Sequence, residues 1–294
     1  MKSKEFNSIL GLFEVFPDEQ SCVDFYEKIR WGGNVVSPFD STSKVYKCKN
    51  NRYKCKNTGK VFNVRTGTLF DNTKVPLRKW FIAMYMEANH KRGISSCLLA
   101  RDIGVCQKTA WHMLRRIREC FKEDENFMLS NEVEIDETFV GGKNKNRHWD
   151  KKVEKSTGRC HKDKTPVFGM LQRDGKVIAK VVPDTKTKTL LPIIYKHVEK
   201  GSTIYSDEWM AYSKLYLDYH HEIVDHGHGI YAVGNNTTNR MEGMWSHLKR
   251  AIIGTHYHVS RKYLQLYVDA ECFRYNERNI SQFDRFNLLL SKSG

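Results

Sequence analysis

Hydrophobic and polar residues alternate with two different periods along this 294-residue chain. Within residues 6–30, apolar residues recur at the three- to four-residue spacing of amphipathic helices. Residues 44–70 instead alternate polar and apolar positions in short runs, which are separated by Asn50-Asn51 and Thr58-Gly59. Such pairs favour tight turns between strands. The pattern predicts short helices followed by a small β-ribbon.

Residues 76–122 return to helical spacing. Pro76 suits the first turn of a helix, and Ser95 suits the N-cap of a second, shorter one. Gly104 permits a tight turn into a third helix. The inner face of this helix would carry Ala110, Met113, Leu114, Ile117 and Phe121. This order predicts a helix-turn-helix, with an ordinary helical hairpin as the alternative.

The other face of the third helix carries amide, aromatic and basic side chains. Side chains of these types bind DNA phosphates and base edges when a helix enters the major groove. The candidate DNA-binding residues are Gln107, Lys108, Trp111, His112, Arg115 and Arg116.

Residues 132–294 are predicted to form one α/β domain with a mixed five-stranded sheet. Three strands are expected first, then a helix, a strand, a short helix, a fifth strand and long helices. A Gly-, Lys- and Asn-rich insertion, residues 141–164, separates the first two strands. This order of elements is that of ribonuclease H-like folds, although other α/β folds share it.

Positive charge is concentrated in one part of the chain. The net charge is +15, and residues 44–118 hold 18 Lys and Arg against three acids, so that the remainder is balanced. An acidic stretch, residues 119–137, follows directly. A basic segment followed by a carboxylate-rich one favours a part that binds a polyanion and a part that binds metal. The simpler alternative is a solvated basic surface.

Three acids stand out by their positions. Asp136 lies within the first predicted strand of the α/β domain, Asp207 ends a later strand, and Glu242 opens a helix. Burying a strand-borne aspartate is costly unless a partner such as a divalent cation compensates its charge. Oxygen ligands without clustered Cys or His favour Mg²⁺ or Mn²⁺ over zinc. Two such ions about 3.5–4 Å apart catalyse phosphodiester chemistry in many enzymes.

Neighbouring polar residues compete for these roles. Glu134 shares the strand face of Asp136 and is its main rival, whereas strand alternation predicts that Glu137 faces away. Asn239, Glu242 and Lys249 share one helix face, so that Lys249 is placed to bind a DNA phosphate beside the metals. Taken singly, each acid is equally compatible with a surface carboxylate.

Several short segments of the chain resemble those of a known protein family. Asp136, Asp207 and Glu242, with 34 residues between the last two and Lys249 seven residues further on, resemble the DDE signature of insertion-sequence transposases. The chain resembles the ISXO-like transposases from about residue 15 to about residue 280. The matching segments are Arg65-Thr-Gly-Thr-Leu-Phe, Pro76-Leu-Arg-Lys-Trp-Phe, Gly93-Ile-Ser-Ser, Gln107-Lys-Thr-Ala-Trp, Glu134-Ile-Asp-Glu-Thr, Gly254-Thr-His-Tyr-His-Val-Ser and Phe273-Arg-Tyr-Asn-Glu-Arg.

The resemblance implies a division of labour between the two ends of the chain. The front part would bind the terminal inverted repeats of the element, and the ribonuclease H-like part would nick the 3′ ends and join them to target DNA. Asp136, Asp207 and Glu242 would hold Mg²⁺ or Mn²⁺, and Lys249 would assist. Asparagine is the third residue in some relatives, which keeps Asn239 as a lesser candidate beside Glu134.

The front part departs from the family at its zinc ribbon, which usually carries two Cys-x-x-Cys pairs. The first pair falls on Ser37 to Asp40 and the second on Cys55 to Thr58, so only Cys55 remains of four ligands. Because a structural zinc site needs four ligands, we predict that no zinc is bound.

These observations predict three parts: a degenerate zinc-ribbon-like region over 1–75, a helix-turn-helix domain over 76–125 and a catalytic domain over 126–294. Double-stranded DNA, as element ends and target, is the expected partner. Bringing two ends together requires a homodimer or a larger assembly. The sequence shows no apolar run long enough for a membrane helix, no secretory signal and no cysteine spacing typical of a disulfide framework. A bacterial cytoplasmic, nucleoid-associated protein is therefore expected. The alternatives are a transposase-derived DNA-binding regulator and a ribonuclease H-like nuclease.

Overall fold

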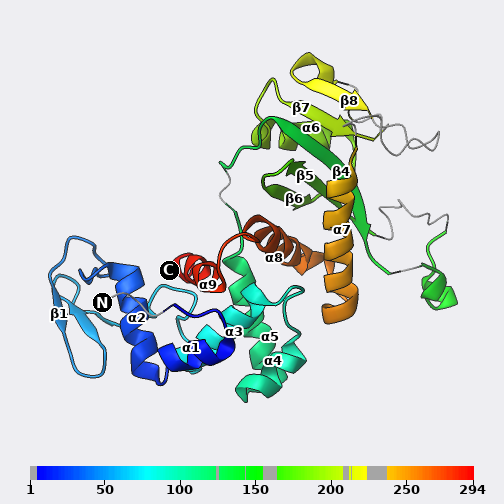
Figure 1. The fold of residues 1–294 in the computed structure, drawn as a ribbon. Helices are drawn as coiled ribbons and strands as arrows, with labels where there is room; N and C mark the ends of the chain where they lie inside the picture. Colours follow the sequence, from blue (N-terminus) through cyan, green and yellow to red (C-terminus); the bar gives the residue numbers. More distant parts are fainter. Residues whose placement is uncertain are drawn as a thin grey trace. The chain divides into compact units, whose positions relative to one another are not determined.

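The computed structural model describes residues 5–123, 126–142, 144–154, 164–207, 212, 214–223 and 237–294. The chain forms two compact units, the first made of residues 1–121 and 279–294 and the second of residues 122–278 (Figure 1). Among the described residues no helix has the length and apolar character needed to cross a lipid bilayer. The seven cysteines in the described ranges are all free thiols.

The first unit begins with two helices and a small sheet. Helix α1 spans Ile9–Val15, and α2 spans Glu19–Trp31 behind a capping box formed by Asp18 and Ser21. Strands β1 (Val45–Lys47), β2 (Tyr53–Cys55) and β3 (Val61–Phe62) pair antiparallel in that order. Between β1 and β2, Asn50 and Asn51 have φ of 60° and 54°, the left-handed conformation that a type I′ hairpin turn requires. The predicted β-ribbon is confirmed.

Three helices follow, α3 (Leu77–Asn89), α4 (Ser96–Ile103) and α5 (Gln107–Glu119). The hydroxyl of Ser95 accepts a hydrogen bond from the backbone N of Leu98 at 3.2 Å, which caps α4. Gly104, at φ +61°, ends α4 in the left-handed conformation and turns the chain toward α5. The five residues predicted for the inner face of the third helix are all buried: Ala110, Met113, Leu114, Ile117 and Phe121.

The last sixteen residues, 279–294, belong to the first unit, although the predicted catalytic domain extended to the end of the chain. Their helix α9 (Gln282–Ser291) buries Phe283 and Phe286. Both rings contact Phe6 near the N-terminus, with centroid distances of 5.1 and 5.6 Å. An aromatic cluster between the two ends of the chain therefore places this helix, and burial of its apolar face is the physical reason.

The second unit contains a mixed five-stranded sheet, as predicted. Its strands are β4 (Glu132–Val140), β5 (Thr165–Gln172), β6 (Val177–Val181), β7 (Thr203–Ser206) and β8 (His220–Ile223). They lie in the order β6-β5-β4-β7-β8. Strands β4, β5 and β6 pair antiparallel, whereas β7 and β8 join in parallel.

Helices cover both faces of this sheet and create two hydrophobic cores. Helix α6 (Thr187–His197) packs Leu190 and Ile194 against Phe168 and Met170 of β5. Helices α7 (Asn239–Ala251) and α8 (Leu264–Asn276) pack against the alternate residues of the same strand, such as Val167. Figure 1 shows α7 running alongside β4.

Several short turns complete the described part of this unit. Asn144–Asn146 and Trp149–Lys151 form 3₁₀ turns within the insertion, most of whose remainder lies outside the described residues. The short helix expected before β8 corresponds, where described, to a 3₁₀ turn at Leu215–Leu217. Beyond α7 the chain continues as a π-helix over Ile252–His256 and a 3₁₀ turn at Arg261–Tyr263.

Candidate active site

Asp136 within β4 and Asp207 directly after β7 occupy matching positions in two neighbouring parallel segments. The last pair in the ladder between β4 and β7 joins Glu134 to Tyr205, and each aspartate lies two residues further along the chain. Side chains two residues apart on a strand point to the same face. The two carboxylates are accordingly close, with oxygen atoms within 4.8 Å of each other. Strand register therefore brings together two residues that are far apart in sequence.

Asp136 is held in place by two hydrogen bonds. The indole Nε1 of Trp245 donates to its Oδ2 at 3.0 Å, and the backbone N of Glu137 donates to its Oδ1 at 2.8 Å. Burial, together with the negative charges of Asp207 and Glu242, raises the pKa of Asp136 to about 6 despite these two donors. Crowded negative charge at a half-buried carboxyl is the electrostatic setting that a cation relieves.

Gly169 explains how α7 comes close enough to reach Asp136. This glycine pairs with Asp136 across the β4–β5 ladder. A Cβ atom at residue 169 would lie 2.4 Å from Cε of Met241 and 2.6 Å from the ring of Trp245. Any side chain larger than hydrogen would therefore collide with α7. The absence of a side chain here is what lets the indole of Trp245 reach the aspartate.

Glu137 lies closer to the two aspartates than strand alternation predicts. One of its carboxylate oxygens is within 4.8 Å of those of Asp136 and Asp207. The hydroxyl of the buried Tyr212 donates a hydrogen bond to Oε1 of Glu137. Alternation fixes the direction of Cβ only, and the longer glutamate side chain carries its carboxylate back toward Asp136. The expectation that Glu137 faces away from the site was wrong for its carboxylate.

Glu134, the expected rival of Asp136, is already engaged by protein donors. It is 1% exposed, and its Oε1 accepts a hydrogen bond from Nε of Arg173 at 3.0 Å. Its Oε2 accepts hydrogen bonds from the backbone N of Arg240 and of Met241 at 3.0 and 3.1 Å. These two amides belong to the first turn of α7, where backbone donors lack partners within the helix. Glu134 thus joins β4 to the start of α7.

The other candidates lie on exposed positions of α7. Asn239 begins the helix, Glu242 lies in its first turn and Lys249 in its last turn. Among the described residues, the group with carboxylate oxygens within 4.8 Å of one another contains Asp136, Glu137 and Asp207, and not Glu242. The carboxylate of Glu242 is nevertheless near enough for its charge to raise the pKa of Asp136.

The donor atoms of this cluster suit a divalent cation. Three carboxylates offer oxygen atoms within one small volume. Hard cations such as Mg²⁺ and Mn²⁺ prefer oxygen ligands of this kind. The arrangement fits metal-dependent chemistry on a phosphodiester.

In the first unit, the candidate DNA-binding residues of α5 fall into two groups. Lys108 and His112 are exposed, and Trp111 is half-buried with its ring 5.0 Å from that of His112. The remaining three make contacts within the protein. Gln107 donates to Oγ of Ser96 at 2.8 Å, Arg115 lies 3.6 Å from Glu119, and Arg116 donates to the backbone O of Asp71 at 3.0 Å.

Sequence reasoning missed a buried ion pair beneath this surface. Nε of Arg118 on α5 lies 2.9 Å from Oε1 of Glu87 on α3, and the two side chains are 3% and 0% exposed. Oε2 of Glu87 also accepts a hydrogen bond from the backbone N of Ile94 at 3.0 Å. The signal was present in the sequence, because Arg118 follows Ala110 and Leu114 at intervals of four on the inner face of the helix.

The positions of the lost zinc ligands hold a hydrogen-bonded polar cluster. Cys55 is fully buried, and hydrogen bonds from the hydroxyls of Ser37, Ser43 and Thr58 lower the pKa of its thiol. Oδ2 of Asp40 accepts a hydrogen bond from Nδ2 of Asn57 at 2.8 Å. One thiol, two hydroxyls and an engaged carboxylate do not match the four nitrogen or sulfur ligands of a structural zinc site.

Comparison with known proteins is consistent with this geometry. Residues 128–276, half of the chain, match the ISXO2-like transposase domain. The chain is 30% identical over 273 residues to an uncharacterized protein in transposable element ISH50 of Halobacterium salinarum, covering 87% of this chain and 90% of that protein. It is 29% identical over 106 residues to an uncharacterized transposase-like protein of Haemophilus influenzae, covering 36% of this chain and 85% of that protein.

Proposed function

Because the chain belongs to the ISXO2-like transposase family, we propose that it binds the terminal inverted repeats of an insertion sequence, cleaves the DNA at their 3′ ends and joins these ends to target DNA. The observation that carries this proposal is the convergence of Asp136 and Asp207 on parallel strands. We assign the second unit to the ribonuclease H-like folds on its strand order and on this pair.

The reaction would proceed in two steps at one site. In the first, the oxygen of water forms a bond to phosphorus at the element end, and the 3′ oxygen leaves and takes up a proton. In the second, that 3′-hydroxyl loses its proton and attacks a phosphodiester of the target, whose own 3′ oxygen leaves. Each step breaks one P–O bond and forms another at a phosphodiester, so a single set of ligands serves both.

Asp136 and Asp207, with Glu242 from α7, would hold the divalent cations. Cations bound there would increase the acidity of the attacking hydroxyl and neutralise charge on the departing oxygen. The hydrogen bond from Trp245 orients Asp136. Glu134 fixes the start of α7 and thereby the backbone position of Glu242. Lys249, two turns beyond Glu242, would bind a DNA phosphate, and Asn239 remains the lesser alternative as third ligand.

Binding of the element ends falls to the first unit. We propose that α4 and α5 act as a helix-turn-helix whose outer face contacts DNA through Lys108, Trp111 and His112, with Arg115 beside them. The exposure of Lys108 and His112 supports this assignment. Arg116 is better assigned to holding Asp71 than to reading bases. Two protein copies would bring the two ends together.

The test is an incubation of the full-length protein with labelled element ends, unlabelled target DNA and Mg²⁺. A transposase yields nicked ends and joined products. Binding without cleavage would indicate a regulator, and cleavage without joining a nuclease. Asp136→Asn and Asp207→Asn should each abolish cleavage and leave end binding intact, whereas Asp218→Asn, at a surface ion pair with Lys200, should behave as the parent.

A further inference from the structure

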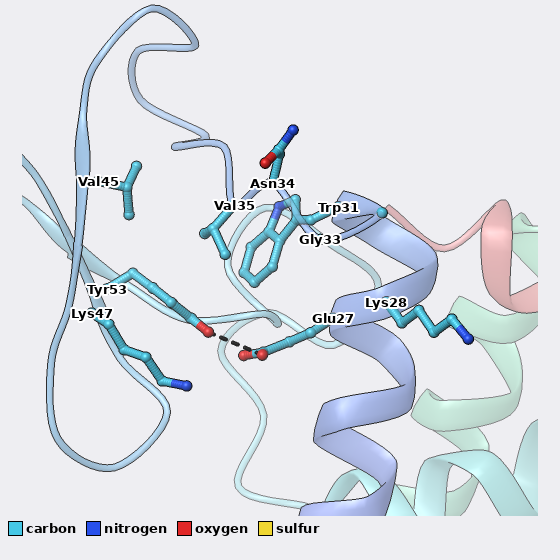
Figure 2. A pocket seen from close by; sticks show the side chains of 10 residues that line it. Glu27, Lys28, Trp31, Gly33, Asn34, Val35, Val45, Lys47 and Tyr53 are labelled. Atoms are coloured by element: carbon cyan, nitrogen blue, oxygen red, sulfur yellow. Dashed lines mark hydrogen bonds between the residues drawn. The ribbon is translucent and has the colours of Figure 1, made fainter. Parts of the chain in front are cut away.

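A pocket in the first unit lies between the end of α2 and the β-ribbon, away from the residues assigned so far. Its volume is about 720 Å³, within the range of about 300–1,000 Å³ typical of small-ligand sites. Glu27 and Trp31 line it from α2, and Lys47 and Tyr53 line it from the ribbon (Figure 2). It combines an aromatic wall, a carboxylate and a basic rim.

The wall of the pocket suits a flat ring. Trp31 and Tyr53 meet at an interplanar angle of 80° with centroids 5.4 Å apart, and Val35 and Val45 add apolar surface beside them. Beyond Trp31 the chain continues through two glycines at positive φ, Gly32 and Gly33, and a Cβ atom at either would meet nothing within 4 Å. The pocket is therefore open where these glycines border it.

Glu27 lines the pocket and carries an unsatisfied acceptor just beneath its surface. Its Oε2 accepts a hydrogen bond from the hydroxyl of Tyr53 at 2.9 Å. Its Oε1 is buried and, within the described part of the chain, has no hydrogen-bond partner. Burial and the adjacent charge of Glu27 raise the pKa of Tyr53 to about 12, so this tyrosine stays a donor. A buried carboxylate oxygen without a donor is costly, and an N–H group of a ligand would relieve that cost.

The charge around the pocket selects an anionic ligand. Lys47 extends on the ribbon side of the pocket, opposite Glu27 (Figure 2). The ribbon and its turns carry further basic residues, Lys44, Lys49, Arg52, Lys54, Lys56 and Lys60. A cationic ligand would match the carboxylate and the rings but would be repelled by Lys28 and Lys47, the two lysines that line the pocket. A ligand with a flat ring, an N–H donor and a phosphate matches all three features.

We propose that this pocket binds one unpaired base of single-stranded DNA that carries an exocyclic amino group. The carboxylate of Glu27 turns its Oε1 toward the pocket and accepts a hydrogen bond from the amino group, the ring packs on Trp31, and Lys47 binds the adjacent phosphate. Carboxylates accept from the amino group of cytosine, and bases stack on aromatic side chains in many single-strand binding proteins. Thymine has no amino group and would bind less well. The inference rests on the proposed role of the first unit in binding DNA ends.

The experiment measures fluorescence anisotropy of labelled single-stranded dC12 and dT12 with the full-length protein at one fixed salt concentration. The parent should bind dC12 more tightly than dT12. Glu27→Gln keeps an oxygen for Tyr53 but presents an NH₂ group in place of Oε1, so the preference should vanish or reverse. Glu14→Gln, an exposed change on α1, is the matched control and should leave the preference unchanged.

Trp31 supplies the second arm of the test. Trp31→Ala should weaken binding of both strands by about tenfold or more, since stacking contributes about 1–3 kcal/mol per base. Trp31→Phe keeps a stacking ring and should retain most of the affinity, which separates stacking from any loss of folding in the alanine variant. Circular dichroism checks the fold of each variant.

Three results with the variants and competitors would overturn the inference. They are an unchanged dC12 to dT12 ratio in Glu27→Gln, unchanged affinity in Trp31→Ala, and displacement of dC12 by argininamide but not by dCMP. Duplex end binding and cleavage without any single-strand binding would reject the pocket while leaving the proposed function standing. Loss of all DNA binding and cleavage in the parent would reject both.

Discussion

The indole of Trp245 and the carboxylate of Asp136 are joined by a hydrogen bond of 3.0 Å from Nε1 to Oδ2. This bond connects α7 to β4 directly beside Asp207. It leaves the aspartate fewer orientations than a strand residue would otherwise have, so the carboxylate is oriented before any cation arrives. Residues that hydrogen-bond to a metal ligand and orient it are usually needed for full metal affinity or activity.

We therefore expect Trp245→Phe, which keeps the aromatic ring and removes the donor, to lower metal affinity or cleavage by about 10–100-fold. End binding should not change, because we assign it to the first unit. The measurement is the rate of end nicking as a function of Mg²⁺ concentration. Trp149→Phe, at an indole that is 85% exposed, is the matched control. Equal rates for the two variants would remove Trp245 from the site.

Glu242 and Glu137 compete for the role of third ligand, and their neutral variants should separate them. Glu242→Gln should abolish cleavage. Glu137→Gln should retain measurable cleavage with a raised Mg²⁺ requirement, because Tyr212 already engages one of its oxygens. Titration of cleavage with Mg²⁺ and with Mn²⁺ provides the comparison. The reverse order of effects would assign the third ligand to β4 and not to α7.

Lys108 and Arg116 should behave differently although they lie on the same helix. Lys108→Ala removes an exposed cation and should reduce the slope of log affinity against log salt by about 0.9 for duplex ends, with little change in thermal stability. Arg116→Ala should instead lower the unfolding temperature, because this side chain binds the backbone O of Asp71. Equilibrium binding at several salt concentrations and thermal unfolding test the two outcomes. A salt slope unaffected by Lys108→Ala would place the DNA elsewhere.

The buried pair of Glu87 and Arg118 predicts a stability effect separate from the chemistry. Arg118→Met leaves the carboxylate of Glu87 buried without its partner and should cost about 3–5 kcal/mol of unfolding free energy. The double variant Glu87→Gln with Arg118→Met should recover part of this loss, since the uncompensated charge is gone. Urea unfolding of the full-length protein measures both. Additive losses would show that the two side chains are not coupled.

Local pattern was sufficient to predict much of the fold. The hairpin turn at Asn50-Asn51, the cap at Ser95, the glycine turn at Gly104 and the five-stranded sheet all follow from spacing and residue type. Position along a strand also singled out Asp136 and Asp207. Strand neighbours were not predictable in the same way, because the β4–β7 register that joins the aspartates depends on pairing across 70 residues.

The features that the sequence did not predict share one physical cause. The positions of α7, of α9 and of long side chains are set by tertiary contacts. Glu134 and Asp136 look alike on the strand, and only the placement of α7 shows that Glu134 binds its first backbone amides. Glu137 was misplaced because Cβ direction does not fix a carboxylate three bonds away. Helix α9 packs within the first unit, and local pattern could not indicate this because Phe6, its contact, lies at the other end of the chain.

Gly169 offers a simple route by which the proposed cleavage activity is lost. It bears no reactive group, yet a single added methyl would force the side chains of Met241 and Trp245 to move and so disturb the indole that orients Asp136. The first unit, to which we assign end binding, would be untouched, so the protein would still bind its element ends without cutting them. One substitution at a position without chemistry of its own would thus convert a transposase into a protein that binds the ends of its element but no longer moves it.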